Sequence, residues 1–179
     1  MSQLKVNSII PTAGVATGQG GGIIQVIKAE ERSSVSFASI AFGGTSGDVL
    51  TCNITPTSNT SKILIQAMLN VSISQTANTV YGKIFRGGSI IDGSVNQDSN
   101  GNRNEIHTSA LIRYDWQLQA LPFLYIDDPG STSQQTYQLR LSHSSTSTQT
   151  LYLNHAYQNT NNAGYGVSAS FLHLMEVSA

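Results

Sequence analysis

Alternation of apolar and polar residues dominates the chain from residue 22 onward. Six apolar side chains occupy every second position between residues 62 and 74, which is the pattern of a half-buried β-strand. Two further apolar residues, Leu64 and Met68, interrupt the polar face of that strand. The alternation recurs at residues 137–141 and 151–153, between clusters of Ser, Thr and Asn that indicate turns. The pattern predicts a chain built of short strands.

A glycine pair connects two of the predicted strands. Gly87 and Gly88 separate residues 81–86 from residues 89–95, and they can adopt the positive φ angles of a tight hairpin turn. The other predicted strands cover residues 23–28, 35–42, 49–54, 106–114, 118–126 and 167–177. No apolar stripe at helical spacing is sustained. About ten short strands joined by polar turns predict an all-β protein, an antiparallel β-sandwich or jelly roll.

The last predicted strand is apolar on both faces. Phe171 and Met175 lie on one face, whereas Leu172 and Leu174 lie on the other. One interpretation is a central strand of the sandwich, buried on both faces. The other is that one face packs against neighbouring subunits of a symmetric oligomer, with these four residues as candidate contacts.

A glycine-rich segment separates the strand-forming body from the start of the chain. Residues 1–17 mix apolar and polar side chains and are predicted to form an extended arm that anchors the protein on a partner surface. The flexible joint at residues 18–22 contains Gly18, Gly20, Gly21 and Gly22. It lacks the lysine and the following helix of a phosphate-binding loop. The predicted organisation is arm 1–17, joint 18–22 and β-sandwich body 23–179.

Charge and length narrow the choice of partners. The chain has 179 residues, of which 11% are charged, and its net charge is -1. Such a surface has no electrostatic attraction for nucleic acids or anionic membranes, so neither is an expected partner. No segment approaches the ~20 consecutive apolar residues of a membrane span, and we find no signal peptide. Synthesis and retention in a cytosol are expected.

No set of side chains is typical of a catalytic site. The chain lacks a nucleophile elbow, a zinc-binding His-Glu-x-x-His, a phosphate loop and a Cys-x-x-Cys pair. A catalytic triad could be assembled from His107, Asp115 and one of many serines, but serine is so abundant that this combination is weak evidence for an active site. The single cysteine, Cys52, lies in a strand-like stretch without a neighbouring base, so we expect it to be buried and unreactive. We therefore expect a non-enzymatic protein without a cofactor.

Two patterns resemble metal sites without completing one. Residues 98–105 begin with the alternating oxygen ligands of a calcium loop, but the glycine and the glutamate are misplaced for that motif. His143, His155 and His173 are candidate ligands on an oligomer axis, although structural histidines fit the pattern better. We expect no bound metal.

Several segments resemble a family of tailed-bacteriophage virion proteins that is frequent in phages of cyanobacteria and other aquatic hosts. The resemblance begins with Leu4-Lys-Val-Asn-Ser-Ile-Ile-Pro11 and the following Gly18-Gln-Gly-Gly-Gly-Ile-Ile-Gln-Val26. It continues through residues 60–65, 85–89, 123–129, 136–139 and 172–177. Members are described as virion structural proteins, tail fibres or head decoration proteins. The resemblance implies a jelly-roll body that assembles as a homotrimer.

The first functional hypothesis is a capsid cement, or decoration, protein. In this hypothesis a trimer made in the host bacterial cytoplasm sits on the virion surface, where its arms reach across neighbouring major capsid protein subunits. Burying the apolar side chains of the arm would hold it there. The residues expected to carry attachment are Leu4, Val6, Ile9 and Ile10.

The alternative hypothesis is a tail-fibre or baseplate protein that binds a host-surface glycan. Amide and aromatic side chains suit sugar recognition by hydrogen bonding and stacking. The predicted contacts are Asp98 and Asn161, in the two most polar loops, and Trp116. Tyr114, Phe123 and Tyr125 are further aromatic candidates, although aromatics at a strand-turn-strand junction more often pack the core.

Overall fold

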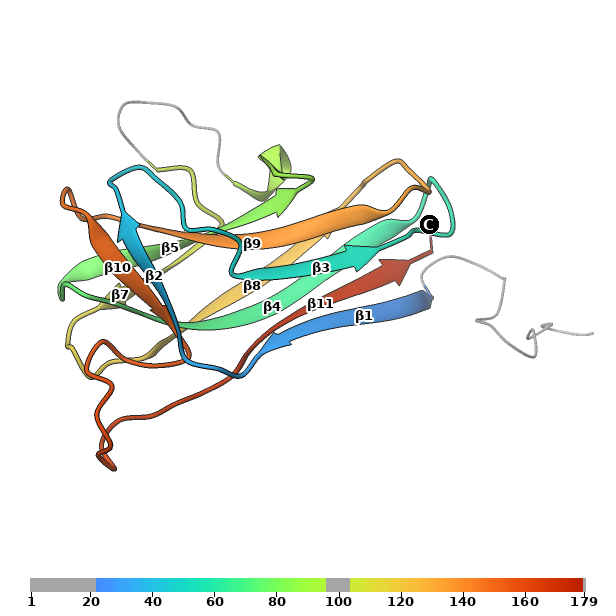
Figure 1. Cartoon of the computed structure of the whole chain (residues 1–179). Coiled ribbons are helices and arrows are strands. Elements are labelled where there is room, and N and C mark those ends of the chain that lie inside the picture. Colours follow the sequence, from blue (N-terminus) through green and yellow to red (C-terminus); the bar gives the residue numbers. More distant parts are fainter. Residues whose placement is uncertain (1–21, 96–103, 179) are drawn as a thin grey trace, which may run out of the picture.

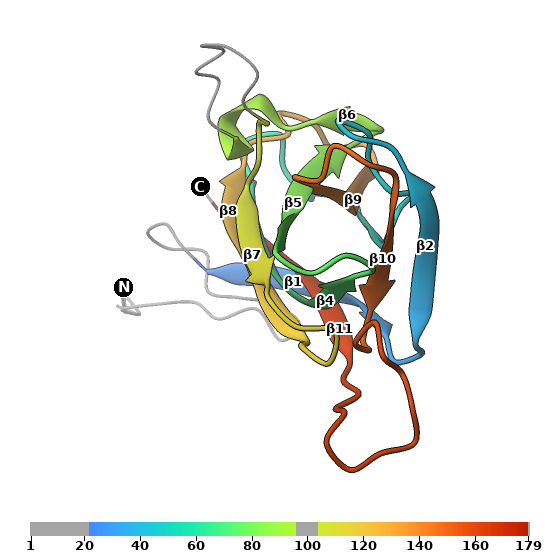
Figure 2. The same ribbon diagram turned by 90° about the vertical axis from the view of Figure 1, so that its left-hand side faces the viewer.

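The protein folds as a two-layer antiparallel β-sandwich, seen from two directions in Figures 1 and 2. The computed structural model describes residues 22–95 and 104–178. The first sheet contains β1 (Ile23–Glu31), β11 (Ser170–Val177), β4 (Lys62–Ile73), β8 (Gln119–Asp127), β10 (Gln149–Leu153) and β2 (Val35–Ile40). The second sheet contains β3 (Leu50–Ile54), β9 (Gln135–His143), β5 (Asn78–Arg86), β6 (Ser89–Ile90) and β7 (Thr108–Ile112). This architecture confirms the predicted all-β sandwich.

Eight of these strands follow jelly-roll topology. The order is β1-β11-β4-β8 in the first sheet and β3-β9-β5-β7 in the second. Counted along the chain, the first of the eight strands therefore lies beside the last, and the third beside the sixth, as in a jelly roll. Strand β10 pairs with the end of β4, beyond β11, and carries β2 on its other edge.

The core consists of the inward-facing side chains of the two sheets. Period-two alternation places Ile63, Ile65 and Leu69 of β4 inside, where they are completely buried, opposite Leu139 and Leu141 of β9. Burial of each such side chain contributes about 1.5–3 kcal/mol. This alternation is the feature from which the strands were predicted.

The predicted glycine hairpin is confirmed, whereas several strand ends differ from the prediction; β7 and β11, for example, begin at Thr108 and Ser170. Gly87 and Gly88 both have positive φ, +58° and +85°, as a tight turn between β5 and β6 requires. Strand β6 has two residues and is followed by a short 3₁₀ turn, Asp92–Ser94, in place of a strand to residue 95. Strand β2 ends at Ile40 because a turn follows, in which Gly43 has positive φ and the Gly44 N–H donates to the Ala41 carbonyl at 3.0 Å.

Residues 1–21 and 96–103 lie outside the described residues. The predictions for the arm (Leu4, Val6, Ile9, Ile10), for most of the joint (Gly18, Gly20, Gly21) and for Asp98 therefore fall outside the structure. Gly22 continues the pairing of β1 with β11. Its N–H donates to Ser178 Oγ at 3.1 Å, and its carbonyl accepts from the Ser178 N–H at 3.0 Å.

Candidate functional site

The first sheet turns an apolar face away from the core. Pairing of β1, β11, β4 and β8 aligns Val26, Met175, Leu64 and Ile126 in one row across the four strands. Val26 is 55% exposed and Ile126 is 61% exposed. A polar, solvated sheet face would carry polar side chains at these alternate positions, so this row is unusual for a monomer surface.

A second row lies four residues further along β11, β4 and β8. Phe171 of β11 pairs with Met68 of β4, and Met68 pairs with Pro122 of β8. Leu124, which is 67% exposed, lies between the two rows. We call the combined surface the outer patch; its residues are Val26, Leu64, Met68, Pro122, Leu124, Ile126, Phe171 and Met175.

Together with the row between its two apolar rows, which contains Lys28, His173 and Gln66 beside Leu124, the outer patch spans about 400 Å², taking strands about 4.8 Å apart and a rise of about 3.3 Å per residue. Apolar patches of this size commonly mark a binding surface. A charged cluster on β1 and the turn that follows borders the patch. Glu30 pairs with Lys28 and Arg32 at 2.8 and 2.9 Å, and these hydrogen bonds lower its pKa to about 2.

The structure divides the four predicted intersubunit contacts into two pairs. Phe171 and Met175 are part of the outer patch, and both are partly exposed. Leu172 and Leu174 have no exposed surface, because they face the second sheet within the same chain. This corrects the assignment of Leu172 and Leu174 as contacts, and it makes β11 a central strand whose outward face is also apolar.

Sequence reasoning missed the contributions of β1, β4 and β8 to the outer patch. The signal was present in β4, where Leu64 and Met68 interrupt an otherwise polar face. Their alignment with Ile126 and Pro122 depends on strand pairing. The neighbouring position on β11 is occupied by His173, whose ring stacks on Phe171 with 4.8 Å between centroids.

A second candidate site lies where two loops meet, at the end of the sandwich opposite the start of β1 (Figure 1). The loop between β7 and β8 carries Tyr114 and Trp116, whose rings stack in parallel with 5.1 Å between centroids. The loop between β10 and β11 is tied to it through Gln158. The Gln158 N–H donates to the Asp115 carbonyl at 3.0 Å, and its side-chain amide donates to the Asp115 carboxylate at 3.2 Å.

These two loops enclose an open hollow of about 460 Å³, which we call the aromatic hollow. It is lined by Tyr114, Trp116, Gln117, Leu118, Gln119, Gly164 and Gly166. Among the predicted sugar contacts, Trp116 lines the hollow and is 53% exposed. Asn161 is exposed on the loop that forms the facing wall, but it does not line the hollow.

The two other aromatic candidates lie elsewhere. Phe123 is a core residue with 2% of its surface exposed, and it stacks on His107 at a centroid distance of 5.5 Å. Tyr125 lines a different hollow, of about 420 Å³. Alternation along β8 explains the difference, since it places both side chains on the inward face of that strand.

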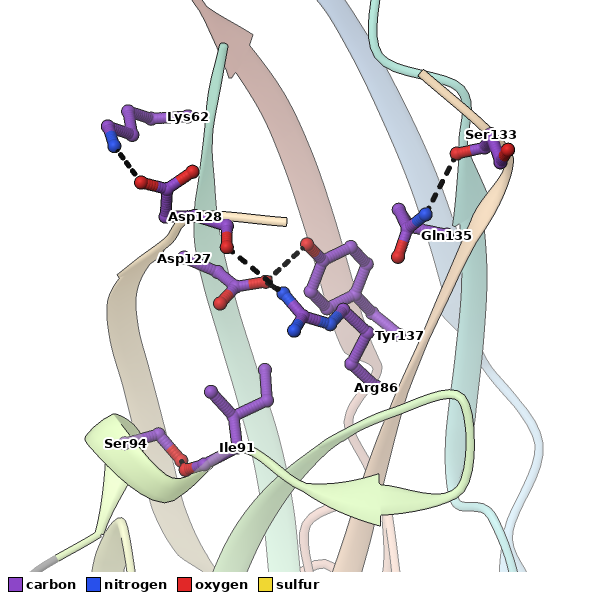
Figure 3. A network of polar contacts seen from close by, with 9 residues as sticks. All are labelled: Lys62, Arg86, Ile91, Ser94, Asp127, Asp128, Ser133, Gln135 and Tyr137. Carbon is purple, nitrogen blue, oxygen red and sulfur yellow. Dashed lines mark hydrogen bonds and ion pairs between the residues drawn. The ribbon is translucent and has the colours of Figure 1, made fainter. Parts of the chain in front are cut away.

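A polar cluster beside this second hollow joins the four strands β4, β5, β8 and β9 (Figure 3). The carboxylate of Asp127 accepts hydrogen bonds from Arg86 at 2.5 Å and from the Tyr137 hydroxyl at 2.7 Å. Lys62 pairs with the neighbouring Asp128. Burial, together with the hydrogen bond to Asp127, raises the pKa of Tyr137. Charges in this cluster compensate one another, so it is best explained as a structural support at this end of the sandwich.

The candidate triad residues do not meet. His107 precedes β7, where its Nδ1 lies 2.8 Å from the Ser94 carbonyl, whereas Asp115 follows β7 and binds Gln158. Five residues of strand separate them by about 17 Å. Cys52 is buried as predicted, and burial raises the pKa of its thiol.

The described ranges of the chain are residues 22–95 and 104–178. Within them, no group of three or more His, Cys, Asp or Glu side chains is arranged to hold a metal ion. The same ranges contain no helix long and apolar enough to cross a membrane.

Comparison with known proteins assigns no family. No protein-family model matches the chain, and no curated protein matches it. Among solved structures, the infectious bursal disease virus Gx strain and the VP2 subviral particle of that virus each match with a TM-score of 0.47 and 11% identity. The Gt strain matches with a TM-score of 0.42 and 12% identity.

These three matches cover all of this chain but 42–43% of the viral chains, so the chain spans less than half of their length. The neighbours are structures of a virus and of its subviral particle. A likeness at this TM-score and identity does not by itself assign a function to the chain.

Proposed function

We propose that the protein is a non-enzymatic bacteriophage virion structural protein, a trimeric cement protein that decorates the outside of the capsid. The observation that carries the proposal is the outer patch, which lies on the sheet whose edge strand begins immediately after residues 1–22. Ile23 and Ile24, at the start of that strand, are also exposed. A rigid apolar face and an N-terminal segment attached at its border suit assembly better than catalysis.

The partner that best fits the outer patch is a second and a third copy of this chain. A stable interface buries about 800 Å² on each partner, whereas the patch supplies about 400 Å². Three patches that face a common axis would therefore shield one another from water, but the area they bury would be too small to hold the trimer together alone. Contacts made by residues 1–21 of neighbouring subunits or by the capsid would supply the remainder.

Attachment to the major capsid protein is assigned to the arm, residues 1–17. Burial of Leu4, Val6, Ile9 and Ile10 contributes about 1.5–3 kcal/mol for each side chain before the cost of ordering the arm. Three arms on one trimer act together, because binding of the first raises the effective concentration of the others. Weak single contacts then give durable attachment.

Electron cryo-microscopy of the intact particle tests the location. Cement predicts regularly spaced density over the head lattice and a copy number comparable with that of the capsid protein. A variant lacking residues 1–17 should fold and form trimers but fail to bind the particle. If this variant still decorates the particle, the proposed role of the arm is wrong.

The trimer has its own test. Leu124→Asp places a charge in the outer patch, and Thr51→Asp places one at an exposed position on the other sheet. Sedimentation should show trimers for the wild-type protein and for Thr51→Asp, and monomers for Leu124→Asp. Trimers that persist in Leu124→Asp would contradict the assignment of the patch.

The aromatic hollow favours the second hypothesis, a tail-fibre or baseplate protein that binds a host-surface glycan. The two loops that line it lie at the end opposite the start of β1, which leaves the hollow accessible when the start of the chain is attached to a particle (Figure 1). Density confined to the tail, together with a low copy number, would support this hypothesis against cement.

A further inference from the structure

The aromatic hollow has the features of a carbohydrate site. Trp116 and Tyr114 stack on each other, yet each is 53% exposed, so ring surface remains open beside the hollow. The C–H bonds on one face of a pyranose ring pack against such an aromatic surface, while hydroxyl groups at its rim need hydrogen-bonding partners.

Amide groups that line the hollow can supply these partners. Gln117 Oε1 accepts hydrogen bonds from the backbone N–H groups of Arg113, at 2.6 Å, and Tyr114, at 3.3 Å. This fixes the Gln117 side chain and leaves its Nε2 to donate. For the half-buried Gln119 amide, the structure records no hydrogen-bond partner among the described residues. Gln119 therefore presents both a donor and an acceptor.

The facing wall is shaped in advance by its own hydrogen bonds. Tyr165 donates from its hydroxyl to Gln158 Oε1 at 2.7 Å, and its backbone N–H donates to the Asn162 carbonyl at 3.0 Å. Gly166 has no atom within 4 Å of the position that a Cβ would occupy, so this wall leaves room for a ligand. Because these hydrogen bonds order the wall before a ligand arrives, the entropic cost of binding is lower.

The absence of charged side chains from the lining of the hollow indicates which class of sugar it binds. None of the residues that line the hollow is charged, and the nearby Asp115 carboxylate is bound to the Gln158 amide. The exposed Arg113 precedes Tyr114 but does not line the hollow, so no cation in the lining compensates the carboxylate of an acidic sugar. Burying such a group without a partner would be costly.

We propose that the aromatic hollow binds neutral hexopyranose units of an oligosaccharide, with Trp116 as the stacking platform and Gln117 and Gln119 as hydrogen-bonding groups. The loops that line this site lie at the opposite end of the sandwich from the start of β1 (Figure 1). The site is independent of the cement role, since a head decoration protein and a tail fibre can both present it outward.

The experiment uses the full chain and a panel of three neutral trisaccharides: maltotriose, cellotriose and mannotriose. The acidic comparison is trigalacturonic acid. Trp116 is the one tryptophan in the chain, so its fluorescence reports directly on the hollow. At least one neutral trisaccharide should shift the emission in a saturable manner, and trigalacturonic acid should not.

Calorimetry with variants identifies the contacts. Trp116→Ala should weaken binding of the responding trisaccharide at least tenfold, and Trp116→Phe should weaken it less. Gln119→Ala should weaken binding by about three- to tenfold. Phe42→Ala removes an equally exposed aromatic residue that does not line the hollow, so it should leave binding unchanged. Circular dichroism confirms that each variant is folded.

Three results would overturn the proposal. They are no response to any neutral trisaccharide, equal binding by Trp116→Ala, and tighter binding of the acidic trisaccharide. Failure here is distinguishable from failure of the cement role, which is read from the position of the protein on the particle.

Discussion

Gly82 of β5 is a position where one added methyl group should measurably weaken the sandwich. A Cβ at this residue would lie 2.4 Å from Phe123 Cζ and 2.8 Å from Phe123 Cε1. It would also lie 2.9 Å from Leu121 Cδ2. Ordinary carbon–carbon contacts are about 3.5–4.0 Å, so the gap is about 1 Å too short.

The neighbours of Gly82 have little freedom to move. Phe123 and Leu121 are core residues with 2% and 0% exposure, and His107 covers one face of the Phe123 ring. Overpacking of this kind costs about 1–3 kcal/mol, against a gain of up to about 1 kcal/mol from the stiffer unfolded chain. We expect Gly82→Ala to lose about 1–2 kcal/mol, which for a chain of this length lowers Tm by about 2–8 °C.

Thermal and urea unfolding, followed by circular dichroism, measure this loss. Gly47→Ala is the matched control, because its Cβ would meet no atom within 4 Å. Shortening the ring with Phe123→Leu should cost less in the Gly82→Ala background than in the wild type, since the clash is then relieved. A Gly82→Ala protein as stable as Gly47→Ala would refute the packing described here.

Two further predictions concern buried carboxylates. Arg86→Met removes the cation that pairs with Asp127, which is 5% exposed. We expect the free energy of unfolding, measured in urea, to fall by about 2–3 kcal/mol; this is less than the 3–5 kcal/mol of a fully buried pair, because Arg86 is one-third exposed. An unchanged unfolding midpoint would contradict the role of this pair. Burial acts to raise the pKa of Glu176, but hydrogen bonds from Gln25 and Thr57 outweigh it and hold that pKa below its ordinary value of 4.5. Ionised Glu176 therefore stabilises the fold above about pH 4.5, and this contribution is lost as the pH falls through the lowered pKa. Glu176→Gln should be less stable than wild type at pH 7 and should approach it at pH 3; a difference that stays constant between these two pH values would argue against the assignment.

Local pattern was sufficient for the fold class and for most strands. Period-two alternation in β4 and the Gly87–Gly88 turn are properties of neighbouring residues, so they can be read without knowing the partner strands. The same local rule predicted that Leu172 and Phe171 point to opposite faces. The alternation could not predict which of the two faces packs against the core, because both faces of this strand are apolar.

The sites depended on tertiary structure. Val26, Leu64, Ile126 and Met175 come from four strands, and their alignment in the outer patch follows from the pairing register. Trp116 was recognised in the sequence as a candidate, but its partners across the aromatic hollow come from a loop more than forty residues away. Hydrophobic alternation determines which way each side chain points within its own strand, whereas chain topology and strand register determine which side chains meet, and these depend on contacts between distant segments.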